Sequence, residues 1–260
     1  MQYRGVVLDV DGTVVRGDEA IPGALDGLAV IDSFGLDRLF VSNNPTKAPP
    51  AYEERLRTAG IEATADEIVT SGTTTTVYLA ATHPGARTFC IGESGIRDQL
   101  REAGLELVGA GDEPEVVVVG IDRTFDYDDL RDAYLALRNG AKFYGTDPDI
   151  IIPTADGDIP GSGAIIRAVA GVAGREPDAV LGKPSPVAQQ IVLERLGLPP
   201  EDVLVVGDRL DTDIAFGLDA GMGTALVRTG VTDDDALAAS EFEPDYVLDH
   251  LGEIGRILSR

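Results

Sequence analysis

Short runs of Val, Leu, Ile and Phe recur along this chain of 260 residues, and amphipathic helical patterns separate them. The runs are almost continuously apolar, which is typical of strands that are covered on both faces. Strands that alternate with helices form parallel sheets wrapped by those helices. The sequence therefore predicts an α/β fold with a doubly wound, mainly parallel sheet, and the clearest strands are expected at residues 5–9, 38–42, 87–91, 115–120 and 202–207.

The domain organisation follows from where this alternation is interrupted. Helices are expected where apolar residues recur at three- and four-residue spacing, at residues 48–59, 94–103, 127–139 and 185–196. Turn-forming residues interrupt the pattern near 83–85 and again near 174–177. We therefore expect a Rossmann-like core in two parts, residues 1–82 and 177–260, with an inserted α/β cap domain at 83–176.

The charge balance is strongly acidic, with 45 Asp and Glu against 21 Lys and Arg and a net formal charge of −24. Nucleic acid is an unsuitable partner, because its binding depends on basic residues that neutralise phosphates. Only three of the basic residues are lysines, and this composition predicts a halophilic source whose salt screens the self-repulsion. No stretch approaches the roughly 18 apolar residues of a membrane-spanning helix, and no signal peptide is recognised. We expect a cytoplasmic protein with no membrane partner.

The strongest motif is VVLDVDGT at residues 6–13, where an apolar strand ends in Asp9 and Asp11. Ligands of doubly wound sheets gather at the carboxyl ends of the strands, and the alternation of a strand points both carboxylates to one side. Two converging carboxylates repel each other unless a cation or a shared proton holds them together. The alternative is structural, with a turn at residues 11–12 and Asp9 as a strand-end cap.

Two further segments carry groups that suit phosphate. Ser42, Asn43 and Asn44 follow the second predicted strand and offer hydroxyl, amide and backbone N–H groups to phosphoryl oxygens. Lys183 precedes a predicted helix, where a compact positive charge would neutralise a phosphoryl group and a nearby carboxylate together. Each segment also has a plain interpretation, as an ordinary turn and as a surface lysine.

The fourth candidate segment follows the strand at residues 202–207, where Asp208 is succeeded by Asp211 and Asp213. Carboxylate oxygens, with water in the remaining positions, are the ligands that Mg²⁺ prefers. We predict that Asp208 is a metal ligand and that Asp213 supports the ligands from behind them. Asp211 is left open, because it also suits the start of a helix.

In chain order these motifs form an acid pair, a hydroxyl, a lysine and an acid, and the sequence resembles the haloacid dehalogenase superfamily of phosphatases. DVDGT is similar to the first motif of that superfamily, Ser42 to the second, Lys183 to the third and GDRLDTDI to the fourth. SNNP, NGAKFYGTDPD and GKPSP resemble the NagD-like, 4-nitrophenylphosphatase branch, which has a large cap between the second and third motifs. Asp147 departs from this pattern, because the branch commonly has Asn-Pro-Asp where this chain has Asp-Pro-Asp.

The resemblance implies a Mg²⁺-dependent phosphomonoester hydrolase that acts on a small phosphorylated metabolite, such as a sugar phosphate or a nucleotide. Asp9 would attack phosphorus to form an aspartyl-phosphate, and Asp11 would act as general acid and then as general base. Mg²⁺ would be held by Asp9, Asp208 and the backbone carbonyl of Asp11.

The resemblance also assigns roles to the neutral and cap residues. Phosphoryl oxygens would be bound by Ser42, Asn43, Asn44 and Lys183, and the substrate loop of the cap would include Tyr144 and Asp147. A catalytically weak phosphate-binding or scaffold protein of the same fold is the alternative function. The physiological substrate and the oligomeric state stay open, with association of copies through the cap as one possibility.

Overall fold

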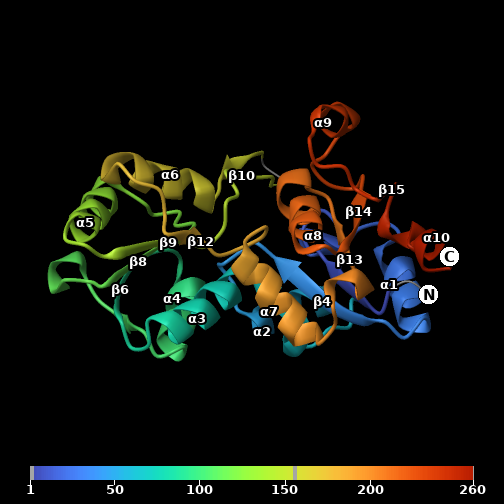
Figure 1. The fold of residues 1–260 in the computed structure, drawn as a ribbon, viewed down its shortest axis with the longest axis horizontal. Helices are drawn as coiled ribbons and strands as arrows, with labels where there is room; N and C mark the ends of the chain where they lie inside the picture. Colours follow the sequence, from blue (N-terminus) through green and yellow to red (C-terminus); the bar gives the residue numbers. More distant parts are fainter. Residues whose placement is uncertain (1–2, 155–156, 260) are drawn as a thin grey trace. The chain divides into compact units, whose positions relative to one another are not determined.

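The computed structural model describes residues 3–154 and 157–259. The chain divides into two compact units, each built from segments that are distant in the sequence (Figure 1). The first unit comprises Met1–Ser42, Pro49–Val69 and Lys183–Arg260, and the second comprises Asn43–Ala48 and Thr70–Gly182. The domain limits at residues 83 and 176 stay a prediction. Among the described helices, none is long and apolar enough to cross a membrane.

A six-stranded sheet with the order β15-β14-β13-β1-β4-β5 forms the centre of the first unit. β1 lies between β13 and β4 and pairs in parallel with both, so that Gly5 lies opposite Val203 and Asp37. Parallel pairing brings the carboxyl ends of these three strands to one edge of the sheet. The strands are β1 (Gly5–Leu8), β4 (Asp37–Ser42), β5 (Ile68–Thr70), β13 (Val203–Gly207), β14 (Gly223–Val227) and β15 (Tyr246–Leu248).

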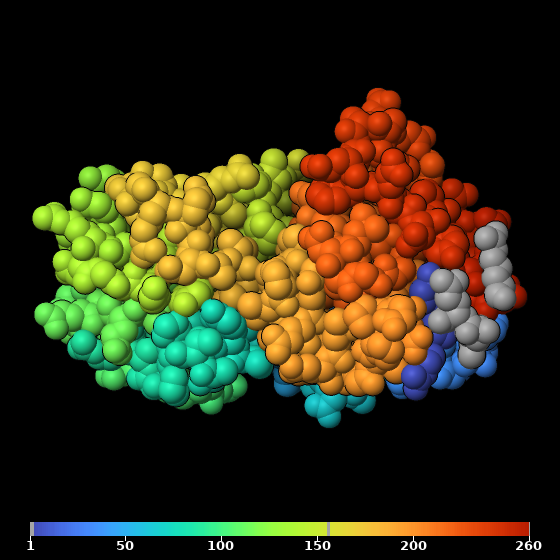
Figure 2. Space-filling model, in the orientation of Figure 1, coloured from blue at the N-terminus to red at the C-terminus, as the bar shows by residue number. Residues whose placement is uncertain are grey.

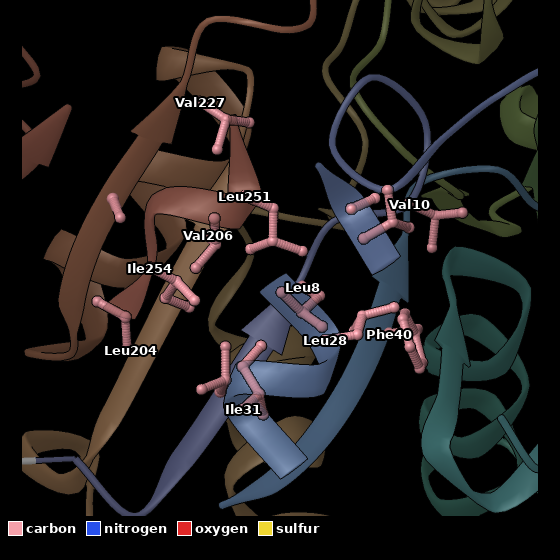
Figure 3. Packing of buried hydrophobic residues seen from close by; sticks show 14 of the residues in the cluster. Leu8, Val10, Leu28, Ile31, Phe40, Leu204, Val206, Val227, Leu251 and Ile254 are labelled. Atoms are coloured by element: carbon pink, nitrogen blue, oxygen red, sulfur yellow. The ribbon is translucent and has the colours of Figure 1, made fainter. Parts of the chain in front are cut away.

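Side chains of β1 alternate between two apolar layers, as the pleat of a strand requires. Leu8 packs on one face with Phe40, Val206 and Leu28 (Figure 3). Val7 packs on the other face, with residues of α7 and α8. Full burial of such a side chain stabilises the fold by about 1.5–3 kcal/mol. The helices of the first face are α1 (Ala24–Ser33), α2 (Pro49–Thr58) and α10 (Gly255–Leu258), and those of the second are α7 (Pro186–Leu196) and α8 (Ala215–Ala220).

Three smaller features of the first unit border the ends of its central strands. A two-stranded hairpin of β2 (Val15–Arg16) and β3 (Glu19–Ala20) follows β1. A π-helical turn, Leu210–Ile214, follows β13 and leads into α8. The short helix α9 (Asp234–Ala239) follows β14. The space-filling view shows α7 and α8 in orange on the surface of this unit (Figure 2).

The second unit has a parallel sheet of its own, with the order β12-β9-β8-β6-β7. Helices α5 (Tyr127–Arg138) and α6 (Ser162–Ala173) bury their apolar sides on one face of this sheet. Helices α3 (Ser71–Thr82) and α4 (Ser94–Glu102) lie on the opposite face (Figure 1). The strands are β6 (Arg87–Ile91), β7 (Glu106–Leu107), β8 (Val116–Val119), β9 (Lys142–Gly145) and β12 (Ala179–Val180), and a separate hairpin joins β10 (Ile151–Ile152) to β11 (Ile159–Pro160).

The predicted fold class is confirmed, since both large sheets pair their strands in parallel and helices separate most of them. Each of the five predicted strands and four predicted helices is present. The predicted first and last residues differ from the observed ones by no more than one position. Several strands were not predicted, among them β9, β12, β14 and β15.

Candidate active site

Asp9 follows the last residue of β1, and its backbone N–H continues the strand pairing by donating to the carbonyl of Val206 at 2.9 Å. The side chain is buried. Its Oδ1 accepts a hydrogen bond from Lys183 Nζ at 2.7 Å, and its Oδ2 lies 3.4 Å from the hydroxyl of Thr13. Burial raises the pKa of Asp9 well above its usual value, although the charge of Lys183 opposes that rise. The carboxylate therefore depends on nearby positive charge to stay ionised.

Lys183 lies just before α7, and its side chain is only 3% exposed. The ammonium group donates to Asp9 Oδ1 at 2.7 Å, to Asp213 Oδ1 at 2.7 Å and to the carbonyl of Val41 at 2.8 Å. Burial alone would lower the pKa of Lys183, but the charges of Asp213 and Asp9 outweigh burial and raise it. Lys183 therefore stays charged and joins the ends of β1 and β4 to the turn after β13.

Asp213 lies in the π-helical turn, and both of its oxygens have donors. Oδ1 accepts from Lys183, and Oδ2 accepts from the backbone N–H groups of Asp208 and Arg209, each at 3.1 Å. This carboxylate thus holds the ammonium group and the chain after β13 in a fixed arrangement. Its contacts suit the supporting role predicted from the sequence better than direct binding of an ion.

Asp208 differs from Asp213 in that only one of its two carboxylate oxygens accepts a hydrogen bond from the described part of the chain. Its Oδ2 accepts from the N–H of Val231 at 2.8 Å, whereas its buried Oδ1 has no hydrogen-bond partner among the described residues. Gly12 and Gly230 face this carboxylate so closely that a Cβ atom on either would collide with it. Burial, followed by the charge of Asp213, raises the pKa of Asp208 to about 7. A buried anion with an unused oxygen requires a cation or a proton.

Three buried carboxylates of the site lie close to one another. Asp9, Asp208 and Asp213 each offer an oxygen, and these oxygens all lie within 4.8 Å of one another. Lys183 supplies a single positive charge against these three carboxylates. Hard oxygen donors of this kind are the ligands that Mg²⁺ prefers. The donor set and the unused oxygen of Asp208 therefore fit a hard divalent ion.

Asp11 lies apart from this cluster of carboxylates. Its side chain is 50% exposed and forms an ion pair with Arg55 of α2, in which Nη2 lies 2.6 Å from Oδ1 and Nη1 lies 3.2 Å from Oδ2. Gly12, which follows it, has a φ of 93°, a conformation that favours glycine and turns the chain away from the sheet. Asp11 thus borders the site with its carboxylate held by an arginine.

The hydroxyl of Ser42 is held inside the first unit. Ser42 ends β4, is buried, and lies 3.0 Å from the hydroxyl of Tyr52. Asn43 and Asn44 belong to the second unit, where Asn43 Nδ2 lies 3.4 Å from Asp149 Oδ1. Asn44 Oδ1 accepts from the backbone N–H of residue 46 at 2.9 Å, and this contact closes a local turn.

Tyr144 and Asp147 are both buried in the second unit. Tyr144 lies within β9, and Asp147 follows the end of that strand. The hydroxyl of Tyr144 lies 2.8 Å from His83 Nε2. Asp147 accepts from the hydroxyl of Thr146 at 2.8 Å and from the N–H of Asp149 at 3.3 Å. Burial, followed by the charge of Asp149, raises the pKa of Asp147 to about 8. The assignment of Tyr144 and Asp147 to a substrate loop stays a prediction.

The comparisons with known proteins agree with this geometry. A family model described as haloacid dehalogenase-like hydrolase matches residues 6–106, and a related HAD-hydrolase-like model matches residues 180–254. The acid sugar phosphatase of Staphylococcus epidermidis is 38% identical over 244 residues, which are 94% of this chain and 93% of the relative. The chain belongs to the haloacid dehalogenase-like hydrolases.

Solved structures place this haloacid dehalogenase-like hydrolase in the predicted branch. It is similar to p-nitrophenyl phosphatase from Archaeoglobus fulgidus, with a TM-score of 0.93, 39% identity and coverage of 99% of this chain and 100% of that chain. It is also similar to NagD from E. coli K-12, with a TM-score of 0.88, 30% identity and coverage of 98% and 99%. The chain is thus an enzyme of the phosphatase group, as its motifs predicted, whereas the halophilic source stays a prediction.

Sequence reasoning missed three polar contributors to the site of this hydrolase. Tyr52 and Arg55 lie in α2, where they contact Ser42 and Asp11. Thr229 follows β14, and its hydroxyl donates to the carbonyl of Gly12 at 2.6 Å. Tyr52 and Arg55 lie within a helix, away from the end of any strand, and Thr229 follows β14, which was not predicted. Asp211, whose role was left open, is exposed.

Proposed function

We propose that this haloacid dehalogenase-like hydrolase is a Mg²⁺-dependent phosphomonoesterase that forms an aspartyl-phosphate with small phosphorylated metabolites. The observation that carries the proposal is the buried contact of 2.7 Å between Lys183 Nζ and Oδ1 of Asp9, one of three clustered carboxylates. The relatives named acid sugar phosphatase and p-nitrophenyl phosphatase support a phosphate monoester as the substrate. Among such esters, the first relative favours sugar phosphates.

Asp9 is the nucleophile in this proposal. A bond forms between a carboxylate oxygen of Asp9 and phosphorus, and the bond between phosphorus and the ester oxygen breaks. Attack requires an ionised carboxylate, and the adjacent ammonium of Lys183 favours the ionised form against the effect of burial. Asp213 keeps the ammonium in place through its own contact of 2.7 Å.

Negative charge at the site requires a counter-ion besides Lys183. Asp9, Asp208 and the backbone carbonyl of Asp11 would hold Mg²⁺, which when bound offsets the repulsion between the carboxylates and the phosphoryl oxygens. The unused Oδ1 of Asp208 is the observation in this chain that supports the assignment. Lys183 and the hydroxyl of Ser42 bind phosphoryl oxygens, and we assign Asn43 and Asn44 to the same task on the resemblance of SNNP alone.

Asp11 completes the proton balance. It protonates the departing ester oxygen, and it then takes a proton from the water that hydrolyses the aspartyl-phosphate. The ester oxygen leaves as an alcohol, and inorganic phosphate is released. Residues 83–176 act as the cap that selects the leaving group, and we assign Tyr144 and Asp147 to this domain's substrate loop.

The test measures phosphate release from 4-nitrophenyl phosphate and a panel of sugar phosphates, with Mg²⁺ and with EDTA. We expect turnover that EDTA abolishes, and a phosphorylated enzyme that hydroxylamine cleaves. Asp9→Asn should lower turnover at least about 10³-fold, whereas Asp219→Asn, at an exposed position of α8, should not. A folded protein that binds phosphate without any turnover would instead support the weak binding protein of the same fold.

A further inference from the structure

Arg55 reaches the proposed acid–base residue from a different element of the first unit. Its guanidinium lies in α2 and contacts both carboxylate oxygens of Asp11, at 2.6 and 3.2 Å. The side chain of Arg55 is 10% exposed, whereas that of Asp11 is 50% exposed. A contact through two parallel N–H groups fixes the direction of a carboxylate as well as its distance. Arg55 is therefore the more firmly placed partner of this pair.

The placement of Arg55 does not depend on Asp11. Its Nε and Nη2 donate to the carbonyl of Gly17 at 3.0 and 2.6 Å. Its Nε also lies 3.6 Å from Oδ1 of Asp18. Gly17 and Asp18 form the turn of the β2–β3 hairpin. The guanidinium also lies 5.7 Å from the centre of the Tyr52 ring, a distance at which a cation and an aromatic ring attract each other. These contacts fix the guanidinium before it meets the carboxylate.

We propose that Arg55 is a positioning residue that sets the conformation from which Asp11 delivers its proton to the leaving oxygen. A half-exposed aspartate samples several rotamers unless a contact selects one, and misplacement of a reacting group by about 1 Å can lower a rate about 10²-fold. Each carboxylate oxygen that accepts from Arg55 retains a further lone pair. Arg55 itself gains and loses no proton in the step. The inference rests on the proposed function.

The test separates proton delivery from every other step through the leaving group. Release of 4-nitrophenolate requires little help from an acid, because the phenol is acidic, whereas release of an alkoxide from a sugar phosphate or glycerol phosphate requires a proton. The value of kcat/KM covers the steps up to departure of the leaving group. It is measured on both kinds of substrate for wild type, Arg55→Gln, Arg55→Lys and Arg57→Gln.

We expect Arg55→Gln to lower kcat/KM on the alkyl phosphate at least about tenfold more than on 4-nitrophenyl phosphate. Arg55→Lys, which retains the charge, should recover part of that difference. Arg57 is the matched control, because it lies on the same helix in an exposed ion pair with Glu54. Arg57→Gln should leave both values within about twofold of wild type, as surface ion pairs contribute little.

Equal losses on both substrates, or no loss on either, would overturn the positioning role. Melting curves show whether each variant folds. If Arg55→Gln does not fold, kcat/KM on the two substrates is compared for Arg55→Lys instead. A wild type with no turnover, or an Asp9→Asn variant that retains it, would overturn the proposed function instead. If turnover depends on Asp9 but the Arg55 substitutions lower kcat/KM equally for both leaving groups, only the role of Arg55 is overturned.

Discussion

The hydroxyl groups of Ser42 and Tyr52 lie 3.0 Å apart in the interior of the first unit. Tyr52 is fully buried, and burial raises its pKa above the usual value, so that the phenol stays protonated. Either group can donate in this hydrogen bond. Tyr52 of α2 thus orients the hydroxyl of Ser42, which the sequence analysis assigns to phosphate binding. No sequence pattern connects α2 with Ser42.

Removal of the Tyr52 hydroxyl is therefore expected to weaken phosphate binding while the fold persists. Tyr52→Phe should raise the inhibition constant for inorganic phosphate several-fold and lower the free energy of unfolding by about 1 kcal/mol, the usual contribution of one hydrogen bond. Phosphate inhibition and urea unfolding provide the measurements. Tyr127→Phe, at a side chain that is 79% exposed, is the control. An unchanged inhibition constant would contradict the assignment of Ser42.

Replacement of Lys183 should affect stability as well as activity. Lys183→Met leaves Asp9 and Asp213 buried without their shared cation, and loss of one partner of a buried ion pair costs about 3–5 kcal/mol. Lys183→Arg should not restore turnover, because a planar guanidinium cannot direct donors to three acceptors as the ammonium does. Urea unfolding and phosphate release test both statements. A Lys183→Met protein as stable as wild type would contradict the first statement, and a Lys183→Arg protein with wild-type turnover would contradict the second.

Fold class was predictable because it depends on local patterns. β1, β8 and β13 consist almost entirely of Val and Leu and are buried on both faces, and such runs stand out in an acidic chain. β14 was not predicted because it begins with Gly223, a weak strand former, and Thr224, which is polar. In the structure the hydroxyl and N–H of Thr224 are satisfied by Asp245, at 3.1 and 2.9 Å, and the sequence carries no sign of this distant partner.

The candidate site was predictable only where chemistry follows a strand. Asp9 and Asp208 stand out because each follows an apolar strand, Lys183 stands out as one of only three lysines, and the structure brings all three together. Tyr52 and Arg55 belong to the segment AYEERLRTA, where they are indistinguishable from ordinary residues of an amphipathic helix. Their contacts with Ser42 and Asp11 arise from packing of α2 on the sheet, which no local pattern describes.

Asp208 provides a test of the metal assignment that does not depend on turnover. Wild type should melt at a higher temperature with Mg²⁺ than with EDTA, since a ligand at 100 times its Kd stabilises a protein by about 2.7 kcal/mol. Asp208→Asn removes one of the three clustered negative charges, so the variant should lose most of the Mg²⁺ effect without becoming less stable in EDTA. Asp219→Asn should retain the full effect. An Asp208→Asn protein that Mg²⁺ stabilises as strongly as wild type would overturn the assignment.

Asp147 predicts how stability varies with pH. Burial and the charge of Asp149 raise its pKa from 3.8 to about 8 in the folded protein. Between these two values the unfolded chain releases a proton that the folded chain retains, so stability falls as pH rises toward 8, by at most about 1.4 kcal/mol per pH unit from this group. Asp147→Asn removes this contribution and should stabilise the protein more at pH 8 than at pH 5. Asp158→Asn, at an exposed position, should leave the pH profile of urea unfolding unchanged. Parallel profiles for wild type and Asp147→Asn would show that Asp147 is ionised in the folded state.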